Sequence, residues 1–182
     1  MGHNAPSVGR GRWRAFVLAA TALLSLAPTA HADEPPEYRL KAAFVYNFAL
    51  FTEWPVEVGA TLNLCVLGAD PFGKEIDALR GKAVGARSLA VQRKSARDSL
   101  DDCQIVFVSS SVITMLAQTL ERLQGRPVLT LADSAGAAQG GVALNMAVTQ
   151  NKVSFEANLV AARGAGLKLS SKLLRLATEV IQ

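Results

Sequence analysis

The stretch TLNLCVLGADPFGKE, residues 61–75, decides the fold class. Its first seven residues form a β-prone, largely apolar run that Gly68 closes. Asp70 and Pro71 then favour the start of a helix, which we predict over residues 71–79. A strand followed directly by a helix is the repeating unit of an α/β domain. Strands and helices should therefore alternate along the rest of the chain.

That alternation is present, and it predicts a single α/β domain with a mostly parallel sheet and helices packed on its faces. Two further strand-like runs joined by Thr149-Gln150-Asn151 predict an antiparallel hairpin added to the sheet. In addition to the elements of residues 61–79, we predict strands at 88–92, 104–108, 128–131, 141–148 and 152–157, and helices at 112–123, 158–163 and 170–181.

A long helix is predicted before the first strand, over residues 37–52, which contain neither glycine nor proline. Phe44 and Phe48 fall on one face of this helix. Asn47 is the only polar residue within a run of ten, so the helix should be buried on more than one side, in the core or against a partner. Trp54-Pro55 ends the segment.

Residues 1–32 have the parts of a secretory signal: a basic start with three arginines, an apolar run over 15–27, and the small-x-small site Ala30-His31-Ala32. The apolar run has 13 residues, short of the ~20 needed to span a bilayer. We therefore expect cleavage after Ala32, and a mature periplasmic domain of residues 33–182.

Charge and histidine content change when this segment is removed. It takes three of the 19 basic residues and none of the 15 acidic ones, so the charge falls from +4 to +1 over 150 residues. Such a chain lacks the basic charge typical of nucleic-acid binding, and we expect none. Both histidines, His3 and His31, are also removed, which excludes Ser-His-Asp and Cys-His catalysis. We expect a protein that is not an enzyme, with no metal and no cofactor.

The segment from Gly68 to Lys74 has the spacing of a phosphate-binding loop between a strand and a helix. Three residues argue against that function. Glu75 stands where a hydroxyl should bind Mg²⁺, Asp70 places a negative charge in the loop, and Pro71 removes an amide donor. The sequence favours an ordinary turn, with Asp70 as the helix N-cap and Pro71 at the first helical position.

Other polar clusters have simple structural interpretations. Ser109-Ser110-Ser111 follows a predicted strand and suits the start of a helix. The alternative stays open that the crevice near Gly68 and Ser109 binds a small ligand, because open α/β sheets place sites beyond the carboxyl ends of their strands. Asp98, Asp101 and Asp102 favour a solvated turn over a calcium site, which needs a glycine-containing loop with more oxygen ligands.

Cys65 and Cys103 are the only cysteines and are separated by 38 positions. In an oxidising compartment such a pair favours a disulfide. Two buried thiols remain the alternative, because spacing alone does not show that the two residues are close.

Motifs at both ends of the chain resemble the YfiR/HmsC-like family of exported bacterial proteins, over nearly the whole mature length. At the start these are Tyr38-Arg39-Leu40-Lys41-Ala42-Ala43-Phe44, Asn47-Phe48 and Glu53-Trp54-Pro55, followed by Leu64-Cys65-Val66-Leu67-Gly68 with Pro71-Phe72. At the end they are Phe155-Glu156-Ala157-Asn158-Leu159, Ala161-Ala162-Arg163, Gly166-Leu167 and Leu173-Leu174-Leu176-Ala177.

The resemblance implies a small periplasmic protein without enzymatic activity that binds the periplasmic sensor region of an inner-membrane diguanylate cyclase and represses it. Release of the cyclase would raise cyclic-di-GMP and favour biofilm formation. The resemblance also implies a homodimer and an outer-membrane lipoprotein antagonist as candidate partners. Cys65 and Cys103 match positions where the family can carry a disulfide.

A partner or ligand surface is the functional site that these observations predict. A periplasmic small-ligand carrier or sensor is the alternative to the repressor. For most of the motif residues, packing within the fold is the simpler role. The candidate surface residues are Trp54, Gly68, Asp70, Ser109, Asn158 and Arg163.

Overall fold

The computed structural model describes residues 1–3, 37–149 and 152–182. Residues 4–32 of the predicted signal, the first mature residues 33–36 and positions 150–151 of the hairpin turn lie outside the described residues. The described residues from Glu37 onward belong to one compact unit.

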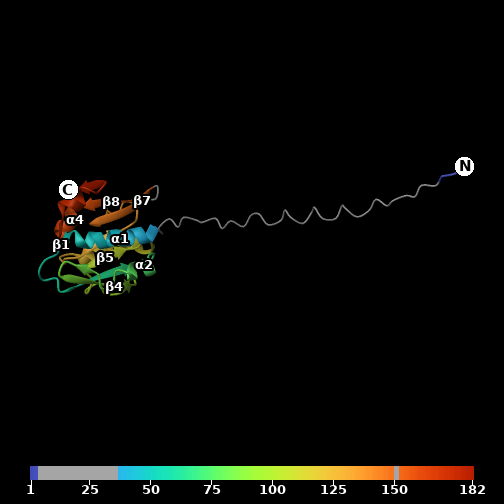
Figure 1. The fold of residues 1–182 in the computed structure, drawn as a ribbon. Helices are drawn as coiled ribbons and strands as arrows, with labels where there is room; N and C mark the ends of the chain where they lie inside the picture. The colour runs from blue at the N-terminus through green and yellow to red at the C-terminus, as the bar shows by residue number, and fades with distance from the viewer. Residues whose placement is uncertain (4–36, 150–151) are drawn as a thin grey trace. The chain divides into compact units, whose positions relative to one another are not determined.

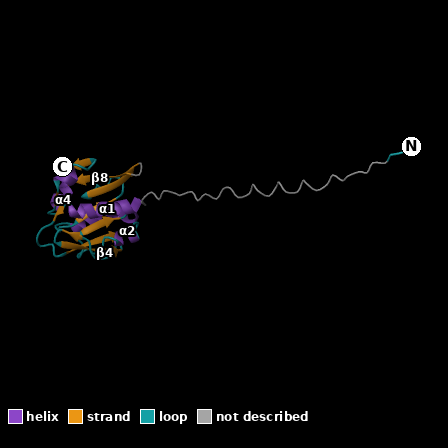
Figure 2. Cartoon of the chain, viewed as in Figure 1, coloured by secondary structure: helices purple, strands orange, loops and turns teal. Residues whose placement is uncertain are grey.

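Helices are interspersed with single strands and with runs of strands along this unit (Figures 1 and 2). In chain order they are α1 (Glu37–Leu50), β1 (Thr52–Glu53), β2 (Thr61–Leu67), α2 (Lys74–Asp77), β3 (Ala83–Val84), β4 (Arg87–Lys94), β5 (Ile105–Val108), the 3-10 helix η1 (Ser110–Met115), α3 (Leu116–Leu123), β6 (Leu129–Ala132), β7 (Leu144–Thr149), β8 (Lys152–Asn158), α4 (Leu159–Gly164), β9 (Lys168–Leu169), α5 (Ser171–Leu174) and β10 (Glu179–Ile181).

Eight of the strands form one sheet in the order β10-β8-β7-β6-β5-β2-β4-β3. The central pairs from β4 through β2, β5 and β6 to β7 are all parallel. β7 and β8 form the antiparallel hairpin. The fold class predicted from the sequence is confirmed: a single α/β domain, mostly parallel, with an added hairpin.

The sheet is buried on both faces, which explains the nearly continuous apolar strands. Leu64 of β2 and Phe48 of α1 belong to the core on one face, whereas Leu67 of β2 and Leu123 of α3 belong to the core on the other. Figure 1 shows α1 lying across the sheet, with the β7–β8 hairpin on one side of it and β4 on the other.

Helix α1 is held in the core by its aromatic side chains. Phe48 is fully buried and meets Phe155 of β8 edge to face, with ring centroids 5.0 Å apart. Phe44, on the same face, contacts both of these rings. The helix ends at Leu50, two residues earlier than predicted, because Thr52 begins β1 and pairs with Leu169 of β9.

The prediction of a helix over residues 170–181 is wrong for the second half of that segment. Helix α5 ends at Leu174, and Glu179–Ile181 forms β10, which adds to the edge of β8 in parallel. The backbone N–H and the hydroxyl of Thr178 both donate to the carbonyl oxygen of Phe155, at 2.9 and 3.0 Å. These bonds, and the β-branched side chains of Thr178, Val180 and Ile181, favour an extended chain here.

The helix predicted at 71–79 is shorter than expected, because α2 covers only Lys74–Asp77. Gly73 adopts a positive φ of 54° immediately before it, so the residues from Pro71 to Gly73 form a turn. Pro71 therefore does not occupy the first helical position, and Gly73 is the N-cap residue in place of Asp70.

None of the helices in the described ranges combines the length and apolar character needed to cross a membrane.

Candidate functional site

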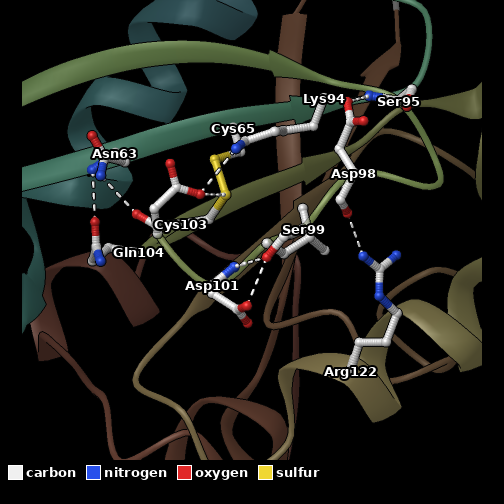
Figure 3. Close-up of polar contacts among 12 residues, drawn as sticks. Asn63, Cys65, Lys94, Ser95, Asp98, Ser99, Asp101, Cys103, Gln104 and Arg122 are labelled. Atoms are coloured by element: carbon white, nitrogen blue, oxygen red, sulfur yellow. Dashed lines mark hydrogen bonds and ion pairs between the residues drawn. A yellow bond between two sulfur atoms is a disulfide. The ribbon is translucent and has the colours of Figure 1, made fainter.

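The two cysteines form a disulfide that joins neighbouring strands (Figure 3). Cys65 lies in β2 and Cys103 just before β5, with their Cα atoms 5.9 Å apart. β2 and β5 are adjacent and parallel, so the disulfide links two neighbouring strands near the middle of the sheet. Both residues are almost fully buried. The predicted pairing is confirmed, and the alternative of two free thiols is excluded.

An ion pair lies against this disulfide. Lys94 Nζ is 3.0 Å from Asp102 Oδ1, and this hydrogen bond lowers the pKa of the Asp102 carboxyl (Figure 3). Asp102 lies within reach of both sulfur atoms, in an arrangement that could resemble a metal site. The sulfurs are bonded to each other and carry no thiolate, so they cannot serve as metal ligands.

The acidic turn before β5 is organised by its own side chains (Figure 3). The Asp98 carboxylate accepts a hydrogen bond from the Ser95 backbone N–H at 2.6 Å, which lowers the pKa of Asp98. The Ser99 hydroxyl donates to Asp101 at 2.7 Å. Arg122 of α3 donates to the Asp98 carbonyl oxygen and ties the turn to that helix. These contacts explain the acidic cluster without a bound ion.

Gly68 and Ser109 end the neighbouring strands β2 and β5, as predicted, and their two loops are in close contact. Ser111 Oγ accepts from the Ala69 backbone N–H at 2.8 Å and lies 2.7 Å from Ser109 Oγ. A Cβ atom at Gly68 would stand 2.6 Å from Ser111 Oγ and 2.7 Å from Ser109 Oγ. The serine side chains therefore occupy the space beside Gly68, where the alternative interpretation placed a small ligand.

Asp70 is held by contacts within its own loop. Its carboxylate accepts backbone N–H groups of Phe72 at 2.7 Å and Gly73 at 3.3 Å, and the Arg93 guanidinium at 2.8 Å. Arg93 also donates two bonds of 2.8 Å to Asp77 of α2. These bonds lower the pKa of Asp77 to about 2 and raise that of Arg93. The segment with phosphate-loop spacing thus holds a carboxylate of its own where a phosphate would lie.

Asn158 and Trp54 make internal contacts. Asn158 is 7% exposed and is the N-cap residue of α4: its Oδ1 accepts from the Ala161 backbone N–H at 2.9 Å, while its Nδ2 donates to the Ala138 carbonyl at 2.8 Å. The structure therefore places this side chain inside the fold and not on an open surface. Trp54 is half-buried and donates its indole N–H to the Ala49 carbonyl at 3.3 Å.

Arg163 differs from these residues because it is exposed. It makes no side-chain hydrogen bond or ion pair with any other residue in the described ranges. Together with Pro55 and Pro127 it lines a cavity of about 410 Å³ beside α4. Val160, on the same helix, is 58% exposed. Of the six predicted surface residues, Arg163 is the one whose charged group is exposed and forms no contact of this kind with another described residue.

A buried charge pair was not predicted from the sequence. Lys41 Nζ of α1 lies 2.7 Å from Asp133 Oδ2, and both side chains are about 95% buried. Glu37 also pairs with Lys41, and the Tyr38 hydroxyl donates to Asp133 at 3.2 Å. Burial lowers the pKa of Lys41, but the hydrogen bonds that its ammonium donates to Asp133 and Glu37 outweigh this effect and raise the pKa above its ordinary value. A lysine among apolar helical residues was the only sequence signal, and it does not reveal a partner 92 residues away.

The fold and these contacts define a small, disulfide-bonded α/β domain in which most of the polar clusters stabilise the loops at the strand ends. The chain belongs to the YfiR/HmsC-like family, whose sequence pattern matches residues 38–178. This match confirms the resemblance drawn from the end motifs. The family is periplasmic and regulatory in character, and is associated with the control of diguanylate cyclases.

The fold is also similar to the crystal structure of a conserved domain protein from Vibrio cholerae O1 biovar eltor, with a TM-score of 0.50 and 7% sequence identity. The similarity covers 79% of this chain and 60% of that one. At this identity it is a similarity of fold alone. This chain corresponds to less than two thirds of the length of the Vibrio protein.

Proposed function

We propose that this protein is an exported repressor that binds the periplasmic region of an inner-membrane diguanylate cyclase and holds the enzyme inactive. Repression lowers cyclic-di-GMP and opposes biofilm formation. The observation that carries the proposal is the match to a regulatory family over nearly all of residues 37–182. A repressor of this kind acts by binding the inactive state of its partner more tightly than the active state.

The charge balance supports a partner chosen by shape and apolar contact. Without the predicted signal segment the chain carries 16 basic and 15 acidic residues, so long-range electrostatic attraction is weak. Among the described residues, large apolar side chains are exposed at Met1, at Met115 of η1 and on two further parts of the fold. Leu50 and Val56 flank β1, and Val160 and Leu176 lie on and after the helices that follow β8.

We propose the surface around α4 as the cyclase-binding surface, with Arg163 as its polar contact. The Arg163 side chain is exposed, and Val160 on the same helix exposes apolar area beside it. Arginine next to exposed apolar groups is the composition enriched in protein interfaces.

The alternative, a small-ligand carrier that uses the crevice between Gly68 and Ser109, has less support. The serine side chains leave too little space at Gly68 for even one added carbon atom. Thermal-shift screening separates the two functions, because a carrier is stabilised by its ligand in the absence of any partner.

Deletion of the gene tests the proposal in cells. In a strain that expresses the cyclase, we expect cyclic-di-GMP to rise on deletion and to return to the starting level with the wild-type gene. Arg163→Ala should restore repression only partly. Lys74→Ala removes an exposed positive charge on α2 and serves as the matched control, which should restore it fully. An unchanged cyclic-di-GMP level on deletion contradicts the repressor function.

A further inference from the structure

A second cavity, of about 500 Å³, lies where strand β6 ends and strand β7 continues beyond it. β6 pairs with β7 only at Leu131 with Leu144 and at Ala132 with Asn145. β7 runs on to Thr149 and pairs there with β8. Among the described residues, no strand covers the other edge of β7 past Asn145, and this edge forms one wall of the cavity. Its volume is within the range of small-molecule sites.

Acidic groups predominate in the lining of this cavity. The carboxylates of Glu37, Asp133 and Glu156 face a single positive charge, that of Lys41. Lys41 is already paired with Asp133 and Glu37. The Glu156 carboxylate has no cationic partner among the described residues, so the lining as a whole attracts positive charge.

Two buried polar atoms that line this cavity, Asn145 Oδ1 and Ser134 Oγ, have no hydrogen-bond partner within the part of the chain that the structure describes. Asn145 is 3% exposed and lines the cavity. Its Nδ2 donates to Glu156 Oε2 at 3.1 Å, which fixes the orientation of the amide, because the reversed amide would place two acceptors together. A buried acceptor without a donor costs stability, and a ligand that supplies the donor recovers that cost.

We propose that this cavity is a binding site for a small aliphatic amine. A primary ammonium group carries the positive charge that the lining lacks, and its N–H donors match the Glu156 carboxylate and Asn145 Oδ1, which lie on the paired strands β8 and β7. The open cavity beside the β7 edge accommodates a short alkyl chain. The proposal stands on these contacts alone and does not rest on repression of a cyclase.

Isothermal titration calorimetry with 1,4-diaminobutane tests the proposal on protein purified from cells that express the full chain. Butane-1,4-diol, of similar length but neutral, is the control ligand. At an ionic strength of about 0.15 M we expect saturable binding of the diamine and none of the diol. In nitrogen-15 NMR spectra, the diamine should shift the side-chain amide signals of Asn145.

Glu156→Gln is the decisive variant, because its amide oxygen can still accept from Asn145 while the charge is removed. We expect it to bind the diamine about tenfold more weakly. Glu121→Gln, at an exposed position of α3, is the matched control and should bind like the wild type. Absence of diamine binding up to about 10 mM, equal binding of the diol, or equal weakening in both variants would overturn the proposal.

Discussion

At the scale of single residues, Gly68 decides how closely the loops after β2 and β5 approach each other. Its φ of +93° favours glycine, and the two serine hydroxyls lie within 2.7 Å of the place where a Cβ atom would be. The sequence predicted that Gly68 and Ser109 end strands of one sheet. It could not predict that the hydroxyls occupy the space beside Gly68, since this depends on side-chain directions after the strands end.

Gly68→Ala is expected to destabilise the protein by about 3 kcal/mol, from the unfavourable φ together with the steric contact. Gly85→Ala is the matched control, because Gly85 also has a positive φ but no atom within 4 Å of the place that a Cβ atom would take. It should cost about 1 kcal/mol. Urea denaturation of the two variants measures the difference, and equal losses would show that the serine contact is unimportant.

Buried polar residues show what sequence patterns leave undetermined at this scale. Asn158 and Arg163 lie in the same predicted helical segment, yet one is a buried cap and the other is exposed. Lys41 and Asp133 are joined only by the packing of α1 against the end of β6. No local pattern encodes such a contact, because its two halves are distant in the chain.

At the scale of elements, Arg93 of β4 fastens α2 through Asp77, whose pKa is lowered to about 2 from an ordinary value near 3.8. A carboxyl with a lowered pKa in the folded state stabilises the protein above its unfolded pKa, and that contribution is lost as the pH falls from about 4 to about 2. Asp77→Asn should therefore be less stable than the wild type at pH 6. The difference in the free energy of unfolding between the two proteins should become smaller as the pH falls.

Urea midpoints at pH 6, 4 and about 2.5 measure this narrowing. Glu121→Gln, at an exposed position, is the control for a general effect of removing one negative charge. A difference in urea midpoint between Asp77→Asn and the wild type that stays constant across this pH range would contradict the role assigned to the Arg93 contact.

The disulfide joins β2 to β5 across 38 positions, and its contribution follows from the loop that it closes. Replacing both cysteines with alanine should lower the free energy of unfolding by up to about 4 kcal/mol, because the unfolded chain regains conformational entropy. Chemical denaturation in urea measures the loss. An unchanged urea midpoint would show that the bond does not stabilise the fold.

The central strands and α1 were predictable because hydrophobic periodicity and the positions of glycine and proline mark them directly. The C-terminal strand β10 was not. Residues 170–181 contain no helix breaker, and Ser171–Leu174 is in fact helical. What makes Glu179–Ile181 a strand is the available edge of β8, which is a tertiary effect on a segment of weak local preference.

At the scale of the whole molecule, two features support the proposed partner, which is recognised by shape and apolar contact. They are the near balance of charge that removal of the predicted signal would leave and the exposed apolar side chains near β1 and α4. A partner of this kind is held by desolvated apolar contacts, and binding should depend only weakly on salt. The signal segment, which the sequence predicts, would place the protein on the same side of the inner membrane as the sensor region of the cyclase.

The most direct test of repression is cyclic-di-GMP measured in spheroplasts of a strain that lacks the gene and expresses the cyclase. Purified protein added from outside reaches only the periplasmic face of the membrane. We predict that cyclic-di-GMP falls with increasing protein, and that Arg163→Ala requires a higher concentration for the same effect. An unchanged cyclic-di-GMP level at saturating protein would contradict the account.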